Sequence, residues 1–241
     1  MFGKNCDKEV KKNGNKKAVI VAGAAVIGVF AAALIVPGIT GEAQKADLYP
    51  VKISQQIGSD EFELTGVYDR KWSGLEASFA NADNSINIKM KFDENGKQIY
   101  QNDYYKRMAM LSTTKTKYNS AGIVVELDTT SDMDMNGEKK ITEKIKLDSD
   151  GHPESSVMYS DGEKVQTGEI ETDWQGNIVK KTVCDLDGSP IFVETDGYDD
   201  NGNLIRQKLH NVANSDDGGD SVMKFEYASY DEIMKGYMRN S

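Results

Sequence analysis

The stretch from Asp132 to Glu143 has the spacing of a calcium-binding loop. Oxygen ligands stand at its first, third and fifth positions, glycine at its sixth and glutamate at its twelfth: Asp132, Asp134, Asn136, Gly137 and Glu143. In such a loop three side-chain oxygens converge on one hard cation, and the final glutamate closes the site with both oxygens. The flanking residues favour strands, so the alternative is a hairpin turn stabilised by Asp and Asn. We expect at most a weak Ca²⁺ site and no other cofactor.

Ser112 and Lys115 have the spacing of the Ser-x-x-Lys motif of serine acyl-transferring enzymes. In those enzymes the motif opens a buried helix, and a later Lys-Thr-Gly motif completes the site. Here threonines surround the pair, and threonine favours strands. No Lys-Thr-Gly follows in the sequence. We therefore predict that the two residues lie on a strand and carry out no catalysis.

The remaining candidates for acid–base chemistry are two histidines and many carboxylates. His152 lies in a predicted turn and His210 ends a predicted strand, and neither has a neighbour that would make it a ligand or a base. The carboxylates gather in turns, where water solvates them, whereas a general acid needs burial to raise its pKa. We therefore predict no catalytic residue and no enzyme. The alternative is an envelope hydrolase or transferase that uses carboxylates in the groove of a sheet.

The distribution of charge separates two parts of the chain. Residues 1–17 carry six lysines against Asp7 and Glu9, a net charge of +4 in a chain of 241 residues and net charge −10, which leaves −14 for the remainder. Clustered Lys and Arg bind a phosphate backbone, so an acidic domain of this kind is not expected to bind nucleic acid.

An apolar segment follows this basic leader. Residues 18–36 contain no charged side chain, and as a helix they would extend about 28 Å, close to the thickness of the hydrocarbon layer. By the positive-inside rule, the lysines keep residues 1–17 in the cytoplasm and the rest is exported. We predict a membrane anchor within 18–40. The alternative is a signal peptide cleaved near Ala43, which would release a secreted protein.

Cys184 is the only cysteine of the predicted exported part, because Cys6 lies in the leader. The residues around Cys184 have a strand-like sequence, which favours a small buried hydrophobe. A disulfide between two chains is the alternative.

The elements that must hold these residues are strands. Residues 86–92 and 223–227 alternate between apolar and polar side chains, the period of a half-buried strand. Ser229 and Glu232 have the spacing of a capping box, which predicts a short C-terminal helix. Residues 41–60 are polar without periodicity and predict a stalk, so that the β-domain occupies 61–241.

Five turn motifs recur along this domain. An Asp or Asn stands three residues before each of Gly96, Gly122, Gly151, Gly176 and Gly202, at spacings of 26, 29, 25 and 26 residues. Glycine accepts the positive φ of a tight hairpin, and Asp or Asn hydrogen-bonds the local backbone. The repeat predicts a mainly β fold, an antiparallel meander of repeated β-hairpins in a flat or curved sheet. Its two edges would be guarded by lysines on 86–92 and 139–147.

Residues 198–204, Tyr-Asp-Asp-Asn-Gly-Asn-Leu, resemble the signature of YD (RHS-type) repeats. Residues 173–178 are a looser copy, and the resemblance covers roughly residues 90–210. It implies a β-repeat architecture and a bacterial envelope setting. In large surface and toxin proteins of this family the repeats spiral into a shell around cargo. The resemblance implies no activity.

The predicted anchor, the turn repeat and the lack of a recognisable set of catalytic residues together predict a membrane-anchored or secreted bacterial envelope protein. Its β-repeat domain would bind a partner protein or an envelope component without catalysis. A further alternative is an immunity-type protein that neutralises a toxin, since an acidic surface suits a basic target.

Overall fold

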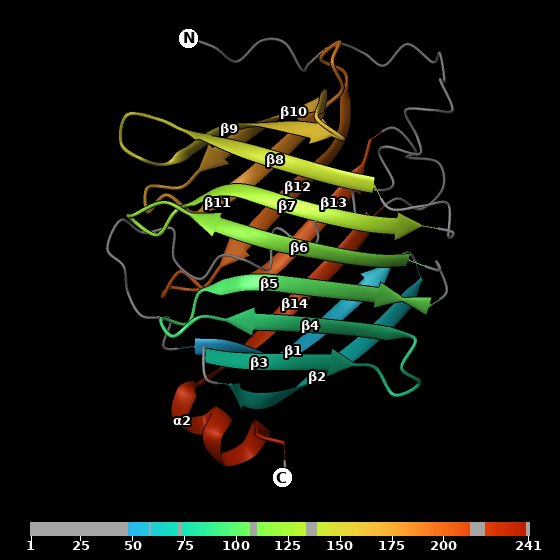
Figure 1. Cartoon of the computed structure of the whole chain (residues 1–241), viewed down its shortest axis with the longest axis vertical. Helices are drawn as coiled ribbons and strands as arrows, with labels where there is room; N and C mark the ends of the chain where they lie inside the picture. Colours follow the sequence, from blue (N-terminus) through green and yellow to red (C-terminus); the bar gives the residue numbers. More distant parts are fainter. Residues whose placement is uncertain are drawn as a thin grey trace.

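The fold is a closed antiparallel β-barrel in this computed structural model, which describes residues 48–57, 59–71, 74–106, 110–133, 139–212 and 220–239. Each strand of the described chain pairs with its sequence neighbours, and the first strand also pairs with the last (Figure 1). The strands are β1 (Leu48–Ile57), β2 (Asp60–Lys71), β3 (Gly74–Ala80), β4 (Ile86–Phe92), β5 (Gln98–Tyr105), β6 (Met110–Tyr118), β7 (Val124–Met133), β8 (Lys139–Leu147), β9 (Pro153–Ser160), β10 (Glu163–Thr172), β11 (Ile178–Cys184), β12 (Pro190–Tyr198), β13 (Leu204–Asn211) and β14 (Asp220–Ser229). A short helix, α2 (Tyr230–Glu232), continues into a π-helical turn, η3 (Ile233–Tyr237).

Closure corrects the predicted meander with two free edges. Strand β1 lies inside residues 41–60, which we predicted as a stalk, and it pairs with β14 from Leu48 opposite Ser229 to Ile57 opposite Ser221. Its alternation is hidden in the sequence because a glutamine, Gln55, takes an inward position after Ile53. The lysines of β4 and β8 therefore guard no edge, since both strands have partners on both sides.

The predicted leader (1–17) and anchor (18–40) lie outside the described residues. Among the residues that are described, no helix is long and apolar enough to cross a membrane.

The predicted turn repeat is confirmed as a set of identical hairpins. In each, the side chain of Asp or Asn accepts backbone N–H groups two and four residues later, as Asp199 does from Asn201 at 2.9 Å and Asn203 at 2.8 Å. Gly202 then takes a φ of 79°, where a side chain would be strained. The same pair of bonds starts from Asp93, Asn119, Asp148, Asp173 and also Asp185.

The five predicted turns lie at one end of the barrel, because each joins an even-numbered strand to the next strand. We call this end, with turns 93–97, 119–123, 148–152, 173–177 and 199–203, the hairpin rim. The tyrosines that precede two turns tie neighbouring hairpins together. Tyr118 donates to the carbonyl of Gln98 at 2.7 Å, and Tyr198 to that of Ile178 at 2.9 Å.

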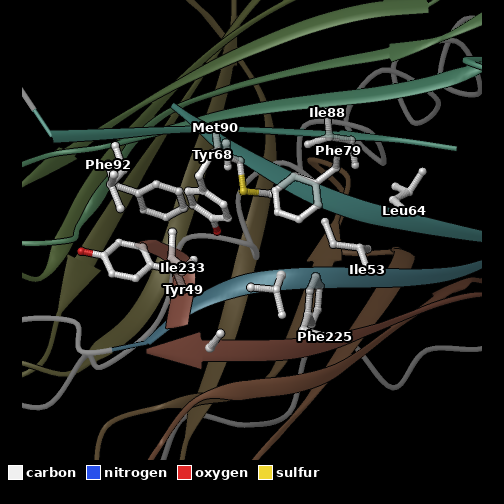
Figure 2. Packing of buried hydrophobic residues seen from close by; sticks show 14 of the residues in the cluster. Tyr49, Ile53, Leu64, Tyr68, Phe79, Ile88, Met90, Phe92, Phe225 and Ile233 are labelled. Atoms are coloured by element: carbon white, nitrogen blue, oxygen red, sulfur yellow. The ribbon is translucent and has the colours of Figure 1, made fainter. Parts of the chain in front are cut away.

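The largest apolar cluster fills one half of the barrel, between β1–β4 and β14. Figure 2 shows Tyr49, Tyr68, Phe79 and Phe92 gathered around Met90, with Ile233 beneath them. Tyr49 and Phe92 meet edge to face, with ring centroids 5.3 Å apart, a favoured arrangement of aromatic rings.

The predicted C-terminal helix and strand faces are confirmed. Ser229 and Glu232 form a reciprocal capping box at the start of α2, and Ile233 of η3 is fully buried in the apolar cluster. On β4 the four apolar side chains face inwards as expected.

Candidate functional site: a buried carboxyl cluster

The interior changes character between β5 and β13, the strands that we call the polar half of the barrel. Its inward positions are occupied by side chains that carry oxygen or nitrogen and are at most 5% exposed, among them Gln101, Asp103, Ser112, Thr114, Thr129, Ser131, Glu143, Ser156, Gln166, Lys181, Glu194 and Gln207. Two small apolar clusters accompany them, one built on Val124 and Leu127 and one on Phe192 and Leu209. Because burial removes the water that would bind these polar groups, they need hydrogen-bond or ion-pair partners within the barrel.

A buried ion pair crosses this interior. Lys181 of β11 places its ammonium 2.6 Å from a carboxylate oxygen of Glu143 on β8, and the side chains are 6% and 7% exposed. Two strands, β9 and β10, separate β8 from β11. The lysine side chain lies close to Gly168 of β10, where an added Cβ would be 3.5 Å from Lys181 Cε, an ordinary contact, but only 2.3 Å from Ser156 Oγ. The missing side chain at Gly168 thus makes room for Ser156 beside the pair.

Two further carboxyl groups, Glu194 and Asp196, share the inward face of β12. Glu194 is opposite Lys181 in the β11–β12 ladder, and Asp196 is opposite Gln207 in the β12–β13 ladder. The two carboxyls hydrogen-bond each other, and Gln207 Nε2 donates to Asp196 Oδ1 at 3.3 Å. We call Glu143, Lys181, Glu194, Asp196 and Gln207 the carboxyl cluster.

The charges of the carboxyl cluster do not balance when every acid is ionised. Three carboxylates would face one ammonium, and Glu143 already pairs with it. Burial, with the neighbouring Asp196, raises the pKa of Glu194 well above its ordinary value, although Lys181 opposes the shift. Burial also raises the pKa of Asp196 to about 7, against the opposing hydrogen bonds from Glu194 and Gln207. The pair therefore retains a proton near neutral pH.

A further buried carboxyl, outside the carboxyl cluster, lies on β5. Asp103 is 2% exposed and accepts a hydrogen bond from Gln101 Nε2 at 2.8 Å, and Gln101 in turn accepts one from Gln98 at 2.9 Å. Burial raises the pKa of Asp103 to about 7. Asp103 is opposite Ser112 in the β5–β6 ladder.

The structure separates the two described ends of the predicted calcium loop. Glu143 is opposite Leu127, so Asp132 stands about 17 Å further along β7 and follows the inward Ser131 on the opposite face. Glu143 points into the barrel and pairs with Lys181, not with Asp132. Asp134 and Asn136 lie outside the described residues. No group of three metal-ligating side chains occurs within the described chain.

The other predicted positions behave as follows. Ser112 is buried inside β6 while Lys115 is exposed on its outer face, so the two do not meet. His152 donates its backbone N–H to Asp148 in a rim turn. His210 is exposed beside Asp220, with Nδ1 2.5 Å from the carboxylate. Cys184 is 2% exposed, which confirms a buried thiol.

Our sequence reasoning missed the carboxyl cluster, although a signal for it exists. Residues 192–198 read Phe-Val-Glu-Thr-Asp-Gly-Tyr, and the two carboxyl residues fall in phase with Phe192 and Tyr198 at a period of two. In-phase positions of a strand share a face. Carboxyls in phase with flanking aromatics therefore indicate acids that face the core.

Comparisons with known proteins identify no family for this chain. No protein-family model matches it, and no curated protein matches its sequence. Among solved structures, it is similar to a porin-like protein from Bacteroides vulgatus (TM-score 0.42, 14% identity, 76% of this chain and 99% of that chain covered). It is also similar to a porin-like protein from Bacteroides uniformis (TM-score 0.34, 11% identity, 75% and 84% covered).

A third solved structure is a putative outer membrane lipoprotein-sorting protein domain from Vibrio parahaemolyticus (TM-score 0.33, 8% identity, 78% and 88% covered). All three TM-scores are below 0.5, so the function has to be argued from this chain's own residues.

Proposed function

We propose that the chain is a non-catalytic cell-envelope protein, tethered by residues 18–36, whose barrel binds a partner protein or an envelope component. The position of the acids supports this proposal. Glu143, Glu194 and Asp103, at 5%, 4% and 2% exposure, are enclosed by the barrel. A carboxylate that acts on a polymer or another large substrate has to reach it, so the alternative of a hydrolase that uses a sheet groove has less support.

The outer wall of the barrel carries charges that face water. Lys52 pairs with Glu63, Lys91 with Glu76 and Lys180 with Glu171, each at 2.8 to 2.9 Å and all on outward positions. Such mixed, half-exposed ion pairs are typical of a solvated surface and contribute little to stability. These parts of the wall are therefore suited to contact with water.

The observation that carries the binding proposal is Trp174, which is 87% exposed at the tip of rim turn 173–177. Tryptophan is costly to leave in water and is enriched at the centres of protein interfaces. Strand β1 begins at this same rim, so the predicted anchor would join the barrel on the side that carries Trp174. We propose the hairpin rim as the binding surface.

Site-specific photo-crosslinking in cells that express the full-length chain tests this proposal. A photoreactive residue at Trp174 should give a discrete adduct, whereas one at Glu171, exposed on the outer wall of β10, should give none. Adduct formation should not depend on the ionisation of the carboxyl cluster, because that cluster lies inside the barrel. The absence of an adduct at Trp174, or equal adducts at both positions, would contradict binding through the rim.

A further inference from the structure

The carboxyl cluster contains one ammonium group that has two possible sets of partners. Lys181 contacts Glu143 on β8 at 2.6 Å, and it is directly opposite Glu194 in the ladder with β12. Residues opposite each other in antiparallel strands have Cβ atoms about 5 Å apart. The positive charge of Lys181 also lowers the pKa of Glu194 and of Asp196, in opposition to burial. Both sets of carboxyl groups therefore lie around the same lysine.

The charged groups that act on this lysine come from β8 and β12: Glu143 on β8, and Glu194 and Asp196 on β12. The intervening strands contribute Gly168 and Ser156, which carry no charge, and Gln207 of β13 binds Asp196. The cluster holds no second lysine, arginine or histidine among the described residues within these contacts. The position of Lys181 is therefore decided by which carboxyl groups carry charge.

The two protonation states favour different partners for Lys181. With one proton shared between Glu194 and Asp196, Glu143 and the pair each carry one negative charge, and the lysine keeps the 2.6 Å contact seen here. When the proton leaves, two adjacent carboxylates repel each other, and the nearest counter-charge is the same lysine.

We propose that the carboxyl cluster is a proton-operated switch in which Lys181 pairs with Glu143 while Glu194 and Asp196 share a proton, and turns to Glu194 and Asp196 once that proton leaves. The exchange removes the ion pair that ties β8 to β11 across β9 and β10. The protonated state thus holds this side of the barrel together, and the deprotonated state loosens it. This inference concerns the interior and does not depend on binding at the rim.

The direction of the pH effect follows from linkage. Both carboxyls have a raised pKa in the folded chain, so the folded state binds protons that the unfolded state has already released. Their stabilising effect is complete at pH values below the ordinary carboxyl pKa and is lost as pH rises to about 7. For one proton, the unfolding equilibrium constant should increase about 30-fold between pH 5.5 and 8.5.

Carboxyl-carbon NMR of the full-length chain, purified in mild detergent, tests the switch without any substitution. Selective labelling of Glu and of Asp separates Glu143 and Glu194 from Asp196. We expect a cluster carboxyl to titrate near pH 7 and the Glu143 resonance to shift with the same midpoint as Lys181 leaves it. Titration of both Glu194 and Asp196 below pH 5, or a Glu143 resonance that does not respond at their midpoint, would overturn the proposal.

Variants provide a second, independent readout. Denaturant unfolding is measured in an Asp103→Asn background, so that the other buried acid does not contribute. The 30-fold dependence should persist in that background and with the outward control Glu171→Gln, and should fall below about threefold when Glu194→Gln and Asp196→Asn are added. An unchanged pH dependence in the last variant would overturn the proposal.

Discussion

The two halves of the barrel interior share one backbone pattern and differ in chemistry. Around β1–β4 and β14 the inward side chains are apolar and aromatic, and Phe79 and Ile88 are fully buried. Between β5 and β13 the inward side chains include carboxyls, amides, hydroxyls and one lysine. Apolar burial stabilises a fold independently of pH, whereas buried acids couple stability to protons. The comparison indicates that the apolar half stabilises the fold independently of pH, whereas the polar half makes the stability of the fold depend on pH.

The largest effect is expected from Phe79→Ala in the apolar half. Phe79 is fully buried and its ring lies against Gly66, where an added Cβ would be 2.7 Å from Cε1. Loss of a buried phenylalanine costs about 3–5 kcal/mol of unfolding free energy, measured by urea denaturation. The matched control is Val67→Ala on the outer face of β2, 39% exposed, which should cost much less. Equal losses would contradict the assignment of the faces.

A smaller effect is expected from Lys181→Met in the polar half. The change leaves Glu143 buried without its counter-ion, which should cost about 3 kcal/mol at pH 5.5, where Lys181 pairs with Glu143. Adding Glu143→Leu removes the orphaned charge and should restore most of the stability. A double variant that is no more stable than the single one would contradict a direct ion pair.

A substitution in a rim turn should reduce the stability of the fold by less than Lys181→Met does. Asp199→Ala removes an acceptor for two backbone N–H groups and for Asn203 Nδ2 at 2.8 Å, which should cost about 1–2 kcal/mol. Hydrogen bonding holds the pKa of Asp199 below its usual range against the effect of burial, so this contribution should be present above the ordinary carboxyl pKa and be lost as the solution is acidified. Urea denaturation at pH 7 and pH 3 checks the sign, which is opposite to that of the carboxyl cluster. Asp199→Asn, which keeps one acceptor oxygen, is the control.

The smallest change in stability is expected from Trp174→Ala. The side chain is 87% exposed, and surface substitutions of this kind alter stability by less than about 0.5 kcal/mol. Thermal and urea unfolding should therefore match the unsubstituted chain. A photoreactive residue at the neighbouring rim position Gln175 should lose its adduct when Trp174 is replaced. A large loss of stability would instead give Trp174 a structural role.

The local elements could be predicted from the sequence, because they depend on short-range patterns. Alternation identified β4, the capping box identified α2, and the Asp-x-x-Gly spacing identified the rim turns. A sixth turn, from Asp185 to Gly188, has the same spacing and the same pair of hydrogen bonds. The role of the tyrosine in the Tyr-Asp pair is visible only in the structure. There the Tyr198 hydroxyl donates a hydrogen bond to the preceding hairpin.

Closure and the carboxyl cluster depend on contacts between distant residues. The pairing of β1 with β14 joins residues about 180 positions apart, and Gln55 interrupts the apolar pattern of β1. In a barrel with a polar interior, the sequence does not distinguish acidic side chains that point inwards from those that point outwards. Glu143 therefore matches the spacing of a calcium loop although it points into the barrel. The contact between Lys181 and Glu143 spans two intervening strands, which no local pattern indicates.

The most direct test of a pH-independent half and a proton-coupled half is amide hydrogen exchange at two pH values. Exchange of the full-length chain at pH 5.5 and 8.5, corrected for the intrinsic rates, reports the local opening free energy of each strand. Among amides that exchange by local opening, protection in β11–β13 should fall about tenfold or more at pH 8.5, while protection in β2–β4 should change less than about twofold. Amides of either half that exchange only by global unfolding should lose protection together, by up to about 30-fold. Equal changes in the locally opening amides of both groups of strands, or no change in either, would contradict the account.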